Sequence, residues 1–209
     1  VSVTIPNSVT LIGDRAFDGC CSLASIVIPD NVTEIGERAF GVCENLRIVT
    51  IANSVTKIGE WAFFYCSNLK VVIIGSSVTS IGKGAFHLCT RLVRVNIPNS
   101  VTSIGEGAFS TCWSLTSVTI PNSVTEIGTG AFRDCRSLKE FKGKYAADGG
   151  RCLIKDNEII AYASASGTKY TIPNSVKTVG QGAFSNCWSL TSVTIPAGVI
   201  EIRDGAFSE

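Results

Sequence analysis

The chain has no methionine and only one histidine among its 209 residues. Because position 1 is not methionine, and because the sequence begins and ends inside a repeat without polar caps, we expect a piece of a longer protein. A single histidine leaves little material for Ser-His-Asp or Cys-His catalysis. The single histidine therefore argues against an enzyme before any motif is considered.

Long apolar runs and charge excess are also missing. No stretch approaches the roughly 18 apolar residues that a membrane-spanning helix needs, and the start has no basic-then-apolar signal peptide. Lys and Arg number 18 against 17 Asp and Glu, a net charge of +1. Nucleic-acid binding requires a clustered basic excess, so this balance argues against it.

A strict internal repeat dominates what is present. Phenylalanine recurs every 23 residues at positions 17, 40, 63, 86, 109 and 132, and cysteine at positions 20, 43, 66, 89, 112 and 135. Phe184 and Phe207 resume the same step after one longer unit. The unit reads L-x-x-V-x-I-P-N-S-V-T-x-I-G-x-x-A-F-x-x-C-x-x. A fixed period of this length is typical of a solenoid.

Each part of the unit predicts a local structure. Val118-Thr119-Ile120 alternates apolar and polar residues with β-branched side chains, which predicts a half-buried strand. Pro121-Asn122-Ser123 has turn chemistry. Gly128, Ala131, Phe132 and Cys135 lie three to four residues apart, which predicts a short helix.

Stacked in register, such units predict an α/β solenoid of leucine-rich-repeat type with about 23 residues per coil. A parallel sheet forms one face and short helices the other. Nine strands are expected, starting near residues 3, 26, 49, 72, 95, 118, 141, 170 and 193. Because no unit can bury its own apolar face, the core comes from stacking. We interpret residues 1–209 as a single solenoid.

One unit is irregular. Phe132 and Phe184 are 52 residues apart, and the extra length lies in residues 142–169. Two strand-like runs, 151–154 and 159–162, flank the polar residues 155–158. This pattern predicts a β-hairpin that replaces the helix of that coil.

The repeat resembles the BspA-type leucine-rich repeats of bacterial surface antigens. The resemblance rests on Pro98 to Gly105 with Ala108, Phe109 and Cys112, and on Pro121 to Cys135. It covers essentially the whole chain, although Arg203 replaces a repeat glycine and Ala52 and Gly75 replace the strand-end proline. Family membership implies a secreted or cell-surface protein of mouth or gut bacteria. Some members bind host matrix proteins or other bacteria, and the ligand differs among members.

The cysteines admit several interpretations. Those in the repeat slot are interpreted mainly as small apolar core residues. Disulfides between stacked coils are the alternative, although parallel side chains suit a bridge poorly. No C-x-x-C pair suggests a metal site, and no phosphate-cradling glycine loop suggests a cofactor. Cys21 and Cys152 lie outside the slot, and whether they are free stays open.

The strand surface offers one candidate binding site. In each strand, the residues before and after the central valine point away from the core and line a concave sheet. Half of them are serine or threonine, as a solvated sheet should show. Four are apolar and lie in consecutive coils beside an arginine and an asparagine, and we call these six residues the strand patch: Val27, Ile48, Val71, Ile73, Arg94 and Asn96. An apolar patch with a polar rim suggests binding; otherwise β-branched residues merely suit strands.

A second candidate lies on the opposite side. Large side chains there interrupt slots that are small or polar in other units, and we call these residues the aromatic patch: Trp61, Phe64, Tyr65, His87 and Leu88. Aromatic residues favour interfaces. The alternative is packing against another segment of a longer protein.

Three functions follow. The favoured one is a secreted or cell-surface adhesion module that binds a host or bacterial surface protein or a glycan without catalysis. The second is a passive spacer for a neighbouring domain. The third is an enzyme whose site lies at the hairpin coil near Tyr145, Asp148, Asp156 and Tyr162, and the lack of convergent acid–base groups disfavours it.

Overall fold

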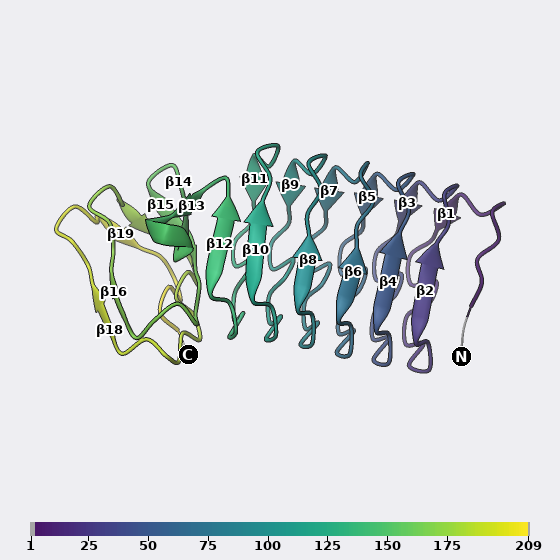
Figure 1. The fold of residues 1–209 in the computed structure, drawn as a ribbon, viewed down its shortest axis with the longest axis horizontal. Helices are drawn as coiled ribbons and strands as arrows, with labels where there is room; N and C mark the ends of the chain where they lie inside the picture. The colour runs from purple at the N-terminus through teal and green to yellow at the C-terminus, as the bar shows by residue number, and fades with distance from the viewer. Residues whose placement is uncertain (1–2, 209) are drawn as a thin grey trace.

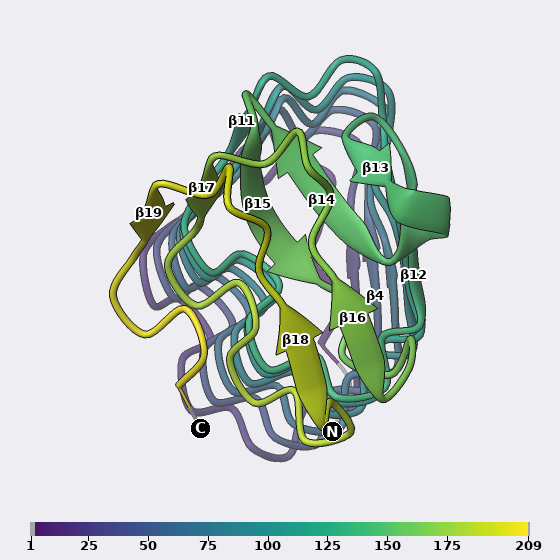
Figure 2. The ribbon, with the colours of Figure 1, turned by 90° about the vertical axis from the view of Figure 1, so that its left-hand side faces the viewer.

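The structure, a computed structural model, describes residues 3–208. The chain winds into a row of coils, each stacked on the one before (Figure 1). Viewed down the stack, the purple to teal coils nearly superpose, whereas the green and yellow coils after β12 depart from their outline (Figure 2). The repeat therefore appears in space as a solenoid with parallel strands, as the 23-residue period predicts.

The strands with the V-x-I pattern form one face. They are β2 (Ser25–Ile28), β4 (Ile48–Ile51), β6 (Val71–Ile73), β8 (Arg94–Asn96), β10 (Ser117–Ile120), β12 (Glu140–Gly143), β16 (Lys169–Thr171) and β18 (Ser192–Thr194). Strands β2, β4, β6 and β8 pair in parallel and in register, as do β10 with β12 and β16 with β18. The first of the nine predicted strands, near residue 3, is not a strand in the described residues, and residues 1 and 2 lie outside them.

A second row consists of strands of two residues each, and one such strand follows each turn. It contains β1 (Leu11–Ile12), β3 (Glu34–Ile35), β5 (Lys57–Ile58), β7 (Ser80–Ile81), β9 (Ser103–Ile104), β11 (Glu126–Ile127), β17 (Thr178–Val179) and β19 (Glu201–Ile202). The six odd-numbered strands from β1 to β11 form one parallel sheet. This second sheet was not predicted, because a two-residue strand leaves no periodic signal.

The core consists of ladders of equivalent residues. Val49, Ile58, Phe63, Cys66 and Leu69 of one coil are all fully buried. Successive phenylalanine rings stack nearly parallel from Phe17 to Phe132, with ring centroids 5.0 to 5.6 Å apart. Each ring thus covers the face of the next, and burial depends on neighbouring coils.

The prediction of short helices on the other face is wrong. Within residues 3–208 the structure has one helix, the three-residue 3₁₀ helix η1 (Asp148–Gly150) in the irregular coil. The glycine-to-cysteine segment is instead a series of tight turns. Two residues of each such segment have positive φ, for example Arg15 at 57° and Gly19 at 74°, and an α-helix does not tolerate that conformation.

Hydrogen bonding explains the turns. Ala16 and Asp18 donate back three residues within the coil, to Gly13 and Arg15, at 3.2 and 3.1 Å. The alternating amides donate to the next coil, as Phe17 does to Ala39 at 2.7 Å. Stacking thus satisfies the backbone groups that a helix would satisfy internally. The three-to-four-residue spacing of apolar positions does not distinguish the two arrangements.

The irregular coil contains the hairpin. Strand β14 (Cys152–Lys155) pairs antiparallel with β15 (Glu158–Tyr162), and β13 (Ala146–Ala147) pairs with β14. The turn has two residues, Asp156 and Asn157, with φ of 51° and 63°, instead of the predicted four. Both values fit a tight type I′ hairpin turn, so each strand extends one residue further.

Candidate functional site

The strand patch lies on the sheet of β2, β4, β6 and β8. Ile48 lies directly opposite Val71, which in turn lies opposite Arg94. In the neighbouring row, Thr50 separates Val27 from Ile73, and Ile73 lies opposite Asn96. The register therefore brings the six predicted residues into two adjacent rows on one surface.

The alternation of the strands decides which side chains reach solvent. The central residues Val49 and Val72 point into the core and are buried. Their neighbours point outward, and the exposed fraction is 65% for Val27, 50% for Ile48, 41% for Val71 and 53% for Ile73. The four side chains form a contiguous exposed apolar surface. Burying it against a partner would stabilise the complex.

A hollow of about 470 Å³ lies at the carboxyl ends of these strands. Val27, Thr50 and Ile73 of the outward rows line it, together with Ala52 and Gly75. Other coils have proline at the slot of Ala52 and Gly75, as at Pro98 and Pro121. The coils of Ala52 and Gly75, which lack the proline ring, thus border the hollow and contribute Ile48, Val71 and Ile73 to the strand patch.

Gly75 is fixed by close backbone packing. A Cβ atom added there would stand 2.1 Å from the backbone oxygen of Ala52 in the preceding coil. No side chain can occupy that position without a shift of the backbone. At Gly75 the hollow is therefore bordered by main chain without a side chain.

The aromatic patch is a compact cluster. Trp61 meets Phe64 edge-on with ring centroids 5.5 Å apart, and His87 stacks on Phe64 at 5.7 Å. Arg38 lies over Phe64 at 5.4 Å, a cation–π contact. Tyr65 is the most open of the aromatic rings, 39% exposed. Because the aromatic rings largely contact one another, they present less free apolar surface than the strand patch.

Histidine 87 is held by the next coil. Its Nδ1 lies 3.1 Å from the backbone oxygen of Ser110. Burial lowers the pKa of His87, and the contact with Ser110 opposes this effect. The imidazole is therefore neutral near neutral pH, and no acid–base partner accompanies it among the hydrogen bonds of residues 3–208.

The residues of the enzyme hypothesis have different partners and surroundings. Tyr145 donates its hydroxyl to Val124 at 3.3 Å, and Asp148 pairs with Arg151 at 3.6 Å. Asp156 stands on the exposed hairpin turn, and Tyr162 is buried. Within residues 3–208 there is no cluster of three or more His, Cys, Asp or Glu suited to a metal ion. No helix of those residues is long and apolar enough to cross a membrane.

The cysteine ladder is structural. The interpretation as core residues is confirmed for Cys43, Cys66, Cys89, Cys112 and Cys135, which are fully buried. It is wrong for Cys20, which is exposed. All nine cysteines are free. Cys21 is exposed, whereas Cys152 is buried with its sulfur 3.1 Å from the hydroxyl oxygen of Tyr170.

Comparison with known proteins identifies the repeat. The model of the "BspA type Leucine rich repeat region" matches in 6 copies, over residues 1–89, 64–146 and 158–209. The chain belongs to the BspA-type leucine-rich repeat family. No curated protein matches the sequence at a significant level.

Solved structures of bacterial proteins share the BspA-type fold. A leucine-rich cell surface protein of Faecalibacterium prausnitzii is 36% identical, with a TM-score of 0.71 over 95% of this chain. A leucine-rich repeat protein of Eubacterium ventriosum is 28% identical, with a TM-score of 0.73 over 89% of this chain. The chain spans 62% and 51% of the lengths of these two proteins. The leucine-rich repeat protein of T. pallidum, 29% identical, has a TM-score of 0.60 over 86% of this chain and 72% of its own.

One further pocket was not predicted from the sequence. It lies at the irregular coil and is lined by residues of four successive coils, among them Ile127, Ile160, Gln181 and Arg203. A sequence signal for it does exist. Only two residues separate Ile159 from Tyr162, whereas four separate Ile127 from Phe132 in a regular coil.

Proposed function

We propose that the chain is an interaction module of a secreted or cell-surface bacterial protein and binds a partner protein through the strand patch. The observation that carries this proposal is the exposure of Val27, Ile48, Val71 and Ile73 on adjacent coils of one sheet. Membership of the leucine-rich repeat family supports an interaction role. The cell-surface description of the Faecalibacterium protein supports the location.

The chemistry of the strand patch favours a protein partner with an apolar segment. The four apolar side chains supply non-directional binding energy, while Arg94 and Asn96 at one edge supply directional contacts. Arg94 takes part in none of the ion pairs formed by residues 3–208. Its guanidinium is therefore available to a carboxylate of the partner.

Titration against purified host matrix proteins tests the proposal. Ile48→Lys and Ile73→Lys should each weaken binding at least about tenfold, equivalent to about 1.4 kcal/mol. Thr194→Lys is the matched control, because Thr194 is exposed at the equivalent outward slot of β18. Its affinity should equal that of the unmodified chain.

The same titration separates binding from the passive-spacer hypothesis. A spacer tolerates charge at every outward position, so both isoleucine variants would then behave like Thr194→Lys. Binding unchanged by both substitutions would remove the strand patch from the proposed function.

A further inference from the structure

The backbone ladder between coils is interrupted beside the hairpin. In the regular coils the amide of Gly84 donates to Glu106 at 2.8 Å, and that of Gly107 donates to Thr129 at 3.0 Å. The equivalent amide in the next coil is that of Gly130. Among the hydrogen bonds of residues 3–208, it has no acceptor in the following coil.

The short irregular coil causes this gap. Ile159 takes the slot of Ile127, since it pairs with Val179, and the ring of Tyr162 stacks on Phe184 at 5.0 Å. With only two residues between them, Ile159 and Tyr162 leave no counterpart of the bulging segment Gly128–Ala131. No strand pairing joins β11 to β15 in the described chain.

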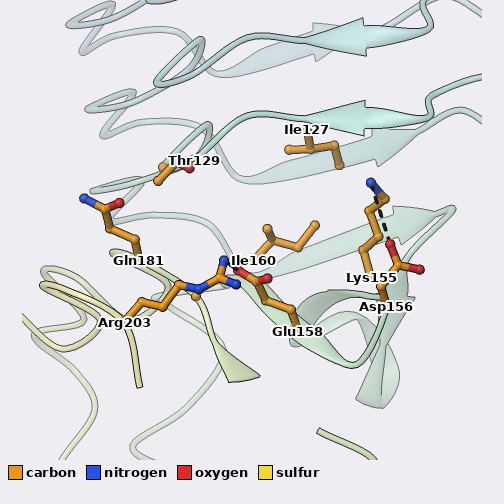
Figure 3. A pocket seen from close by; sticks show the side chains of 10 residues that line it. Ile127, Thr129, Lys155, Asp156, Glu158, Ile160, Gln181 and Arg203 are labelled. Carbon is orange, nitrogen blue, oxygen red and sulfur yellow. Dashed lines mark hydrogen bonds and ion pairs between the residues drawn. The ribbon is translucent and has the colours of Figure 1, made fainter. Parts of the chain in front are cut away.

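Arg133 bridges the coils on either side of the gap. Its Nε donates to the hydroxyl oxygen of Ser185 at 3.0 Å, and its Nη2 donates to that of Ser208 at 3.5 Å. Next to this bridge the gap remains open as a pocket of about 190 Å³. We call it the gap pocket. Figure 3 shows Ile127 and Ile160 between Lys155 on one side and Thr129, Gln181 and Arg203 on the other.

The charges in the gap pocket balance. Arg203 pairs with Glu158 at 2.7 Å, and Lys155 pairs with Asp156 at 3.8 Å (Figure 3). Two cations and two anions leave no net charge, so a neutral polar ligand suits the lining better than an ion. The charged groups of these two pairs can hydrogen-bond hydroxyl groups, while the aliphatic carbons of Ile127 and Ile160 cover the C–H face of a sugar ring.

A second hollow continues the gap pocket along the side of the solenoid that contains Gly130. It has a volume of about 200 Å³ and shares Thr129, Gly130 and Gln181 with the first. Trp61 and the Lys83–Glu106 ion pair line its far part. Three coil steps separate Trp61 from Gly130, about 14 Å at the usual strand spacing of about 4.8 Å. An indole at that distance offers a stacking platform for a further ring of an extended ligand.

We propose that this groove binds a neutral oligosaccharide, with an N-acetylated sugar in the gap pocket. An acetamido group has the acceptor that the Gly130 amide lacks and a donor for the backbone or side-chain oxygen of Gln181. Its methyl group suits the apolar floor of Ile127 and Ile160. This site is separate from the strand patch and does not depend on the proposed protein-binding function.

Calorimetry or saturation-transfer NMR with tri-N-acetylchitotriose tests the proposal, with cellotriose as the probe that lacks acetamido groups. The acetylated trimer should bind with a Kd of about 1 mM or tighter, and cellotriose at least tenfold more weakly. Gln181→Trp should fill the gap pocket and abolish binding, since Gln181 is exposed and the change does not touch the core. Thr129→Trp repeats the test from the opposite wall.

Trp61→Gly probes the far end of the groove. Gly84 and Gly107 occupy the same repeat slot, so the variant keeps the local backbone. It should weaken the trimer and leave the N-acetylglucosamine monosaccharide unchanged. Ile73→Lys, on the strand patch, should change neither. The proposal is overturned if the trimer fails to bind, if cellotriose binds equally well, or if folded Gln181→Trp and Thr129→Trp retain full affinity.

Discussion

The thiol of Cys89 donates a hydrogen bond to the backbone oxygen of Phe63, 3.2 Å away in the preceding repeat. Cys43, Cys66, Cys112 and Cys135 make the same contact with the phenylalanine 26 residues earlier, at 3.2 to 3.3 Å. The repeat therefore uses cysteine for two purposes, to fill the core and to donate to a carbonyl oxygen of the neighbouring coil. A purely apolar residue of the same size serves only the first.

Replacing one ladder cysteine should measure this contribution. Cys89→Ala removes the sulfur from a fully buried site and the hydrogen bond to Phe63. We expect a loss of about 1–2 kcal/mol in the free energy of unfolding. Urea denaturation followed by circular dichroism measures it. Cys21→Ala is the control, because Cys21 is exposed and should change the stability little.

The same thiols should make the protein sensitive to alkali. Burial raises the pKa of Cys43 and of Cys135 to about 12, and raises that of Cys66 and Cys112 well above the ordinary value of 9.0. Between pH 9 and 12 the unfolded chain loses these protons while the folded chain keeps them. Stability is thus unaffected below pH 9 and falls above it, by about 1.4 kcal/mol per pH unit for each thiol.

Denaturation midpoints measured from pH 7 to pH 11 test the alkaline loss. In Cys89→Ala the decline above pH 9 should be shallower by the share of one thiol, because burial also raises the pKa of Cys89. A stability that stays level from pH 9 to pH 11 would contradict the account.

Alkylation should distinguish the cysteines kinetically. Cys20 and Cys21 are exposed, whereas the ladder thiols are buried and remain protonated at neutral pH. Because the thiolate is the nucleophile, iodoacetamide at pH 8 should label Cys20 and Cys21 first. The ladder thiols should react only as fast as the coils open, and peptide mass spectrometry resolves the order. Early labelling of Cys66 or Cys112 would mean that the solenoid opens locally in native conditions.

The positive-φ turns predict a stabilising substitution. Val42 has a φ of 57°, where its counterpart in the first coil is Gly19. A β-branched residue is strained in that conformation, and Val42→Gly should raise the free energy of unfolding by up to about 1 kcal/mol. The matched reverse change is Gly107→Ala, because an added Cβ would lie no closer than 3.8 Å to other atoms and φ is 59°. It should cost about 1 kcal/mol, and equal stability of all three proteins would refute the strain.

The close packing at Gly75 predicts a larger effect. Gly75→Ala places a Cβ against the backbone oxygen of Ala52 and forces the two coils apart. We expect a loss of about 1–3 kcal/mol, measured by thermal or urea denaturation. Gly13→Ala is the control, since nothing lies within 4 Å of a Cβ added there, and its stability should match that of the unmodified chain.

The sequence alone determined the stacking and the outward rows. The 23-residue step of Phe40, Phe63 and Phe86 requires that equivalent residues meet in adjacent coils, because each unit is too small to bury its own apolar face. The period of two in strands such as Val118–Ile120 then fixes which residues point outward. The sequence therefore places Val27, Ile48, Val71 and Ile73 on one surface.

Only the tertiary structure decided the other face and the gap pocket. The spacing of Gly128, Ala131, Phe132 and Cys135 fits a helix as well as it fits turns. The structure has turns, because alternate backbone amides donate to carbonyl oxygens of the next coil. The gap pocket depends on the short connection from Ile159 to Tyr162 and on two coils that flank it. Ile127 and Arg203 are distant in sequence, yet both line the gap pocket because the coils stack on one another. A local sequence pattern cannot predict that two such distant residues share a pocket.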